Sequence, residues 1–338
     1  MRAEARLRRR GITYIRRRLL ALAVPRAPRA AILVAIVCVS FASVFIRWSE
    51  SPALTIALYR MGFATILLVP FLATAKGRQI GALTPRDFGL LAVVGFALAA
   101  HFATWILSLK LVDVATSVVI VTSHPILVAA VSHFALRERV NRRVVAGVLV
   151  GFGGVVLITL TQFGEGTNPL LGSLLALLGA VGLGAYLLAG RRLRQRIELI
   201  PYAVTVYGFA TLFLVVFSLA TATPIVVSTG LGREMTLFLA LAAVSQIGGH
   251  TLYNFALKHL NATVVSTSLL GEPVGASILA FLLLGEVPGC VGGTGGAACP
   301  STPLVVLGSA LALAGIYVTA RASLSASRSS ASGIGEIA

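Results

Sequence analysis

The chain has 338 residues, of which 57% are apolar and only 12% are charged, and its mean hydropathy is +0.94. This composition excludes a soluble globular protein. The net charge of +17 would suit a nucleic-acid-binding protein, but no basic patch with interleaved aromatic residues accompanies it, so we predict no nucleic-acid partner.

The first predicted element is a basic extension over residues 1–29, which is nearly free of acids. We interpret it as a cytoplasmic segment that holds the orientation of the chain; an interfacial amphipathic helix and a disordered arm are the alternatives. Beyond it, apolar stretches of membrane-spanning length follow one another with short polar breaks. We expect ten transmembrane helices, near 30–47, 52–74, 88–108, 112–135, 144–161, 170–190, 201–221, 235–256, 262–284 and 303–320.

Lys and Arg are unevenly distributed over the segments between these helices. If the N-terminus is cytoplasmic, 24 of the 28 basic residues fall on the cytoplasmic side, whereas only Arg47, Lys110 and Arg233 fall on the other side. This asymmetry follows the positive-inside rule and predicts a multi-pass plasma-membrane protein with both termini in the cytoplasm.

The chain also repeats itself. The segment that begins at Leu109, LKLVDVATSVVIVTSHPILVAAVSHFALRERV, aligns without a gap to the segment that begins at Leu257, LKHLNATVVSTSLLGEPVGASILAFLLLGEVP. Five helices in each half is an odd number, so the halves must cross the membrane in opposite senses. We therefore predict an all-α membrane protein of ten helices arranged as two inverted five-helix repeats. The predicted segments are an extension (1–29), a first repeat (30–161), a second repeat (162–322) with an outer insert (287–302), and a disordered tail (323–338).

The centre of the repeat combines prolines with two titratable side chains. Pro125 and Pro273 occupy matching positions, preceded by His124 in the first copy and Glu272 in the second. Proline removes a backbone donor and frees a carbonyl, which a protein-lined cavity can accommodate. A carboxyl removed from water disfavours its charged form and can exchange a proton near neutral pH. We predict that Glu272 binds protons or a substrate ammonium and that His124 belongs to the same pathway.

These residues resemble the EamA-type carriers of the drug/metabolite transporter superfamily. The resemblance covers about residues 30–322; it rests on ASVFIRWSESPALTIALYRMGFATILLVP and above all on SLLGEPVGASILAFLLLGE, the second copy of the repeat unit. It implies ten helices, cytoplasmic termini and export of amino acids, metabolites or drugs. The chain departs from the family in Val39-Ser40, where a Trp-Gly pair is frequent, and in the insert after Glu286.

Several other polar and aromatic side chains lie within predicted helices. Arg60 either snorkels to the headgroups or binds an anion in a cavity. His101 and His250 lie near matching repeat positions and can titrate or pack. Trp105 and Tyr253 also occupy corresponding positions in the repeat, and we predict that they form a paired wall or gate of the cavity. The full predicted pathway comprises Glu272, His124, Arg60, His101, His250, Trp105, Tyr253, Tyr207 and Tyr186.

Two further features concern cross-linking and assembly. Cys290 and Cys299 share the outer Gly-rich insert, where an oxidising environment allows a disulfide. Gly147-x-x-x-Gly151 is a small-xxx-small pattern that serves either a homodimer or internal helix packing.

We therefore predict a secondary transporter that exports small metabolites, amino acids or drug-like compounds by alternating access, coupled to protons or to exchange. Its partners are a small-molecule substrate and the lipid bilayer, and we expect no metal and no cofactor. A passive channel or uniporter is the first alternative. An intramembrane enzyme is the second, although neither the Gly-x-Ser-Gly nor the His-Glu-x-x-His string occurs, nor does a phosphate-binding loop.

Overall fold

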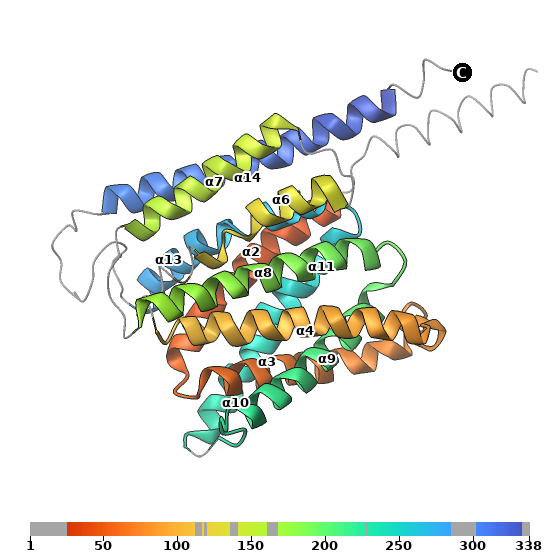
Figure 1. The fold of residues 1–338 in the computed structure, drawn as a ribbon, viewed down its shortest axis with the longest axis vertical. Coiled ribbons are helices and arrows are strands. Elements are labelled where there is room, and N and C mark those ends of the chain that lie inside the picture. Colours follow the sequence, from red (N-terminus) through yellow and green to blue (C-terminus); the bar gives the residue numbers. More distant parts are fainter. Residues whose placement is uncertain are drawn as a thin grey trace, which may run out of the picture.

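The structure is a computed structural model that describes residues 26–111, 117, 120–135, 141–160, 168–227, 229–284 and 302–332. Throughout these ranges the regular structure is helical, and the longer helices pack against one another in a bundle (Figure 1). Cys290, Cys299 and residues 1–25 lie outside the described residues, so the expected disulfide and N-terminal extension stay predictions.

The helices follow one another with short connections. In chain order they are α2 (Arg26–Trp48), α3 (Ala53–Leu68), η1 (Val69–Ala73), η2 (Gly77–Ala82), α4 (Pro85–Ser108), α6 (His124–Ala135), α7 (Arg142–Leu160), α8 (Pro169–Leu193), α9 (Leu199–Ala220), α10 (Leu231–Ala240), the π-helix η3 (Leu241–Thr251), α11 (Leu252–Leu257), α12 (Ala262–Ser268), α13 (Gly271–Leu284) and α14 (Thr302–Ser332).

Each of the ten ranges expected from the sequence contains helix, and α10, η3 and α11 share one range, as do α12 and α13. Seven helical segments of the described part are long and apolar enough to cross a membrane, and two shorter apolar helices accompany them. Large apolar side chains cover the outside, including Leu33, Val93, Leu170 and Leu282, each at least 66% exposed. Such a surface suits lipid rather than water, so the chain is an integral multi-pass membrane protein.

The two halves of the chain interlock through their first helices. Helix α2, from the first half, packs against η3 and α13 of the second half, whereas α8 of the second half packs against α4 and α6 of the first. Glycines allow close approach at both interfaces. A Cβ added to Gly249 would lie 2.5 Å from Val39 Cγ1, and one added to Gly182 would lie 2.8 Å from the Ala97 carbonyl oxygen.

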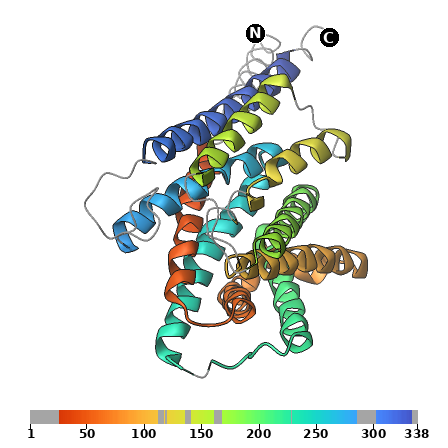
Figure 2. The same ribbon diagram turned by 60° about the vertical axis from the view of Figure 1, so that its left-hand side comes forward.

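Helices α7 and α14 form a separate pair along one side of the bundle, visible in both views (Figures 1 and 2). Their interface is lined by glycine: a Cβ on Gly147 would meet Thr319 and the Gly315 carbonyl, and one on Gly151 would meet Gly315. The small-xxx-small pattern of the sequence is therefore used for packing within the chain, and it offers no support for a homodimer.

The C-terminal helix extends further than the sequence suggested. Helix α14 continues to Ser332, so residues 323–332 are helical where disorder was expected. Six of the ten residues of this stretch are Ser, which is not a strong helix former, but none is Pro or Gly, so a helix already nucleated by packing of its first turns can propagate through it.

Candidate functional site

A small cavity lies between the two halves of the chain. Its free volume is about 20 Å³, which is room for about one water molecule. One Arg and one Glu side chain, of opposite charge, and three histidines reach it from the two halves. The lining residues are Val39, Ala42, Arg60, His101, Trp105, Val121, Thr122, His124, Leu183, His250, Leu269 and Glu272.

Arg60 supplies the positive charge of this cavity. It projects from the middle of α3 and is only 1% exposed, so the snorkelling alternative is wrong for this side chain. Its Nε donates a hydrogen bond to Gln246 Oε1 at 3.0 Å, and its guanidinium carbon lies 4.2 Å from the ring centroid of Phe102. The stacked ring and the amide hold the guanidinium in place at the cavity.

An aromatic wall flanks the guanidinium. His101 and Trp105 are stacked on α4 with ring centroids 5.8 Å apart, and His250 of η3 meets Phe102 edge-on at 5.4 Å. His101 Nδ1 donates to the Gly179 carbonyl oxygen at 2.9 Å, which leaves its Nε2 as the acceptor in the neutral ring. The repeat-related histidines therefore face one cavity from opposite halves.

The prolines mark breaks in two repeat-related helices. Pro125 lies in the first turn of α6 and Pro273 in the first turn of α13, positions where a missing N–H is tolerated. The Val121 carbonyl, four residues before Pro125, accepts a hydrogen bond from His124 Nδ1 at 3.0 Å. The carbonyl that the proline frees is thus satisfied by the neighbouring side chain.

Glu272 supplies the negative charge. It lies in the first turn of α13, is half-buried and lines the cavity, close enough to Arg60 to interact with it electrostatically, although no ion pair within 4 Å is present between these two described residues. The N-terminus of a helix stabilises a negative charge and disfavours a positive one. Its repeat mate His124 has the same place at the start of α6. This position therefore favours the charged form of Glu272 and disfavours the charged form of His124.

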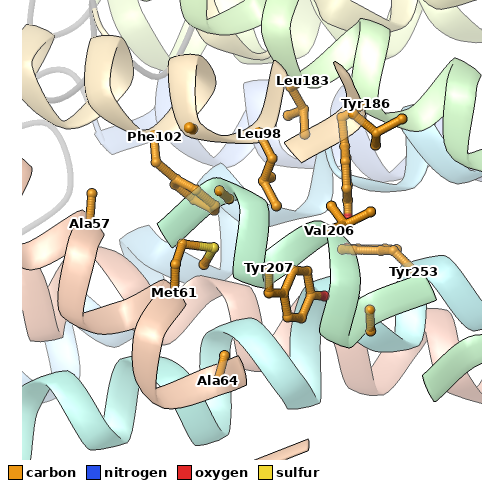
Figure 3. Close-up of a cluster of buried hydrophobic side chains, with 14 of the residues drawn as sticks. Ala57, Met61, Ala64, Leu98, Phe102, Leu183, Tyr186, Val206, Tyr207 and Tyr253 are labelled. Atoms are coloured by element: carbon orange, nitrogen blue, oxygen red, sulfur yellow. The ribbon is translucent and has the colours of Figure 1, made fainter. Parts of the chain in front are cut away.

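A cluster of tyrosines closes the bundle at one end of the cavity. Tyr186, Tyr207 and Tyr253 come from three helices, converge in Figure 3 and are fully buried. Asn254 Nδ2 donates to the hydroxyls of Tyr186 and Tyr207. None of the three tyrosines lines the cavity, so of the expected pair Trp105 and Tyr253 only Trp105 does.

Beyond the tyrosines, the last turn of α8 and the residues that follow it are bound to the end of α11. Arg194 Nε donates to the Asn254 carbonyl at 3.0 Å, and Arg191 donates to the Leu257 carbonyl at 2.9 Å. Cationic and amide donors at a helix C-terminus satisfy its free carbonyls and complement its dipole. Lys258 Nζ also donates to Glu198 Oε1 at 2.9 Å, which lowers the pKa of that carboxyl.

At the opposite end of the bundle, Glu234 of α10 binds the connection between α2 and α3. Its carboxylate accepts hydrogen bonds from the hydroxyls of Ser49 and Ser51 and, at 3.1 Å, from the backbone N–H of Glu50. The side chain is 3% exposed. These bonds tie the first and second halves together on this side as well.

Sequence reasoning did not single out Gln246, Thr251, Asn254 and Glu234, although each makes contacts between helices. A signal was present: Gln246 and Asn254 are amides inside the apolar stretch ALAAVSQIGGHTLYNFALK, and a polar side chain at such a position is usually paired or functional.

Comparison with known proteins agrees with this architecture. A family model described as the EamA-like transporter family matches residues 29–160 and again residues 170–299. A solved crystal structure of a protein that is 18% identical superposes with a TM-score of 0.69 and covers 88% of this chain and 97% of its own, which shows a shared fold.

Three similar proteins are each described as an uncharacterized transporter. An uncharacterized transporter of Archaeoglobus fulgidus is 25% identical over 83% of this chain and 92% of its own length. The uncharacterized transporter YetK of Bacillus subtilis is 27% identical over 76% and 74%, and one of Clostridium kluyveri is 26% identical over 66% and 73%.

Proposed function

Because the chain belongs to the EamA-like transporter family, we propose that it is a secondary transporter that exports small metabolites, amino acids or drug-like compounds across the plasma membrane by alternating access. The observation that carries this proposal is the cavity between the halves, where Arg60 of the first half and Glu272 of the second supply opposite charges beside an aromatic wall. Inverted halves around a central site can expose it to each side in turn.

Glu272 and His124, which occupy matching positions in the two repeats, have different roles in this proposal. Glu272 binds either a proton or the cationic group of a substrate, since one carboxylate cannot fully serve both, and this competition couples proton entry to export. His124 donates from Nδ1 to the Val121 carbonyl, which fixes the tautomer of its neutral ring.

The topology we propose has ten crossings, repeats over 30–161 and 162–322, and both termini in the cytoplasm. In that orientation the tyrosine cluster and the bonds from the C-terminal end of α8 and the residues after it to α11 lie on the cytoplasmic side. The structure then represents a state whose cytoplasmic path is shut, and opening it requires those helix-end bonds to break.

The test begins with a metabolite-resistance screen in cells that overexpress the protein, followed by flux in proteoliposomes with and without a pH gradient. We expect Glu272→Gln to lower flux by at least about tenfold, equivalent to about 1.4 kcal/mol, and to remove its dependence on pH. Undiminished flux that still follows pH would contradict the role of Glu272.

Counterflow separates a carrier from a passive channel. Substrate placed on the far side of the membrane should accelerate flux if the site alternates, because the loaded carrier returns without waiting for an empty transition. Flux indifferent to substrate on the far side would identify a pore. A matched control is Ser218→Ala, which alters a buried hydroxyl on α9 that does not line the cavity and should leave flux unchanged.

A further inference from the structure

Tyr207 of α9 contacts three residues of the η3–α11 segment through its single hydroxyl. The side chain is fully buried and lies in the packed interior (Figure 3). Its hydroxyl oxygen lies 3.0 Å from Thr251 Oγ1, accepts a hydrogen bond from Asn254 Nδ2 at 3.4 Å, and contacts the amide of Gln246. These three partners are each at most 5% exposed. The hydroxyl therefore belongs to a buried polar network, where each bond strengthens its neighbours.

The hydrogen bonds around this hydroxyl have a defined direction. Thr251, the last residue of η3, donates from its hydroxyl to the Gln246 carbonyl oxygen at 3.2 Å. This bond spans five residues, as the bonds of a π-helix do, and it leaves Thr251 Oγ1 as the acceptor of the Tyr207 hydroxyl proton. Tyr207 thus holds Gln246 at two points: directly at its amide, and through Thr251 at its main-chain carbonyl.

Gln246 in turn holds the guanidinium that lines the cavity. Its Oε1 accepts the hydrogen bond from Arg60 Nε at 3.0 Å. A guanidinium has only donors, so an amide that turned away would leave Nε unpaired at a buried position, which is costly. Neither Gln246 nor Tyr207 lines the cavity, so any influence that they have on it passes through Arg60.

The other side of the network reaches the end of α11. The main-chain carbonyl of Asn254 accepts a hydrogen bond from Arg194 Nε at 3.0 Å, and Arg194 is only 1% exposed. In the proposed orientation this bond belongs to the closure of the cytoplasmic path. A continuous path of buried hydrogen bonds therefore joins that closure to Arg60, and its two parts meet at the Tyr207 hydroxyl.

We propose that Tyr207 is a positioning residue: its hydroxyl orients Arg60 through Gln246 and makes that orientation depend on the closed cytoplasmic end. The inference rests on the proposed transport function, in which the central site and the closure change together. When the closure opens, Asn254 separates from Tyr207, the hydroxyl releases Gln246, and the guanidinium becomes free to change partners.

The fluorescence of Trp105 gives a readout of Arg60 that needs no substrate. Trp105 lines the same cavity and packs against Phe102, the ring that lies under the guanidinium. The chain has two tryptophans, so Trp48→Phe leaves Trp105 as the source of the signal. Its emission and its quenching by acrylamide are measured in the purified full-length protein.

In this background Gln246→Leu should change the Trp105 signal, and Tyr207→Phe should cause at least half of that change. Thr251→Val removes the other hydroxyl of the path and should act like Tyr207→Phe, whereas Thr251→Ser keeps the hydroxyl and should keep the native signal. Tyr202→Phe is the matched control, because it removes a buried hydroxyl from the same helix that has no hydrogen-bond partner in the described structure.

The dependence on the cytoplasmic end is tested at Arg194, which does not line the cavity. Arg194→Gln weakens the bond to the Asn254 carbonyl and should change the Trp105 signal. Combined with Tyr207→Phe it should add nothing, because the path is already cut, and such non-additivity is the sign of energetic coupling.

Three results would overturn the proposal. The first is a native Trp105 signal in Gln246→Leu or in Tyr207→Phe. The second is a change in Tyr202→Phe as large as that in Tyr207→Phe. The third is an effect of Arg194→Gln that is absent, or that is equal with and without the Tyr207 hydroxyl.

The outcomes separate this inference from the proposed function, because the fluorescence measurement requires neither substrate nor vesicles. The expected changes of the Trp105 signal without any flux in proteoliposomes would leave the positioning role in place and reject transport. Native flux and counterflow in Tyr207→Phe, together with a native Trp105 signal, would leave transport in place and reject the positioning role.

Discussion

Helix α4 and the helical segment α10–η3–α11 occupy equivalent places in the two repeats but are built differently. Helix α4 is α-helical over Pro85–Ser108, whereas its mate changes to a π-helix over Leu241–Thr251. Both place a histidine and an aromatic residue near the cavity, yet only the π-helical mate adds a buried amide, Gln246. The repeat therefore preserves position, while the local helix type decides which side chains reach the site.

The two interfaces that hold these helices also differ. At the α4 side the glycine belongs to α8: Gly182 lets α8 approach the backbone of Ala97 and His101. At the η3 side the glycine belongs to η3 itself: Gly249 approaches a side-chain atom of Val39 on α2. Backbone cannot move aside, whereas a side chain can be shortened, so the first interface should tolerate less change.

Among the substitutions that test this difference between the interfaces, Gly182→Ala should lower the stability of the protein most. Gly182→Ala should destabilise the protein by about 1–3 kcal/mol, because the new Cβ meets backbone atoms. Gly249→Ala should cost less by itself, because the atom that its Cβ meets first belongs to a side chain. Val39→Ala in the same chain removes that atom, so a favourable coupling of about 1–2 kcal/mol is expected between these two substitutions. Thermal unfolding in detergent provides the measurement.

Gly89→Ala on α4 is the control for these variants, since nothing lies within 4 Å of its added Cβ, and it should be neutral or slightly stabilising. Equal losses for Gly182→Ala and Gly249→Ala, with no recovery in the Val39→Ala background, would mean that the two interfaces are equivalent after all.

An intermediate effect is expected at the mates His124 and Glu272. His124→Gln should lower flux by about three- to fivefold, or about 1 kcal/mol, and leave its pH dependence in place, because the helix start that holds His124 disfavours its charged form. Glu272→Gln should remove the pH dependence. Flux through both variants is measured over a range of pH values, and a flat profile in His124→Gln with a native profile in Glu272→Gln would reverse the assignment.

The smallest effect concerns Glu198 and Lys258 at the end of α11. Since Lys258 lowers the pKa of Glu198 in the folded protein, this pair contributes stability above the unfolded pKa of about 4.3, and the contribution is lost as the pH falls through the lower folded pKa. The pair is partly exposed, so Glu198→Gln should cost under about 1 kcal/mol at pH 7 and nothing in strong acid.

Glu50→Gln is the matched control for this ion pair, because Glu50 pairs with Arg233 on the exposed surface and its loss should not be measurable. The unfolding temperatures of both variants are compared with that of the native protein from neutral to acid pH. If Glu50→Gln lowered the unfolding temperature more than Glu198→Gln did, the Glu198–Lys258 pair would not stabilise the end of α11.

Much of the site could be predicted from the residues alone. The gap-free repeat with Pro125 and Pro273 placed His124 and Glu272 at matching positions, and apolar stretches located the helices, because hydrophobicity and proline act through local chemistry. Arg60, His101, His250 and Trp105 were also named, and the structure brings all four to the cavity. The sequence also predicted three tyrosines at the cavity, but the structure places them outside its lining: Tyr186, Tyr207 and Tyr253. How far a side chain lies from the cavity depends on how the helices cross, which the sequence does not show.

The sequence by itself thus determined that this is an all-helical membrane protein of two homologous halves with a carboxylate and an imidazole at their centres. Only the tertiary structure decided that Gly147 and Gly151 pack within the chain, that the Val121 carbonyl is satisfied by His124, and that the π-helical turn sets Gln246 against Arg60. The physical reason is that composition and periodicity act along the chain, whereas hydrogen-bond pairing and close packing depend on which surfaces meet across it.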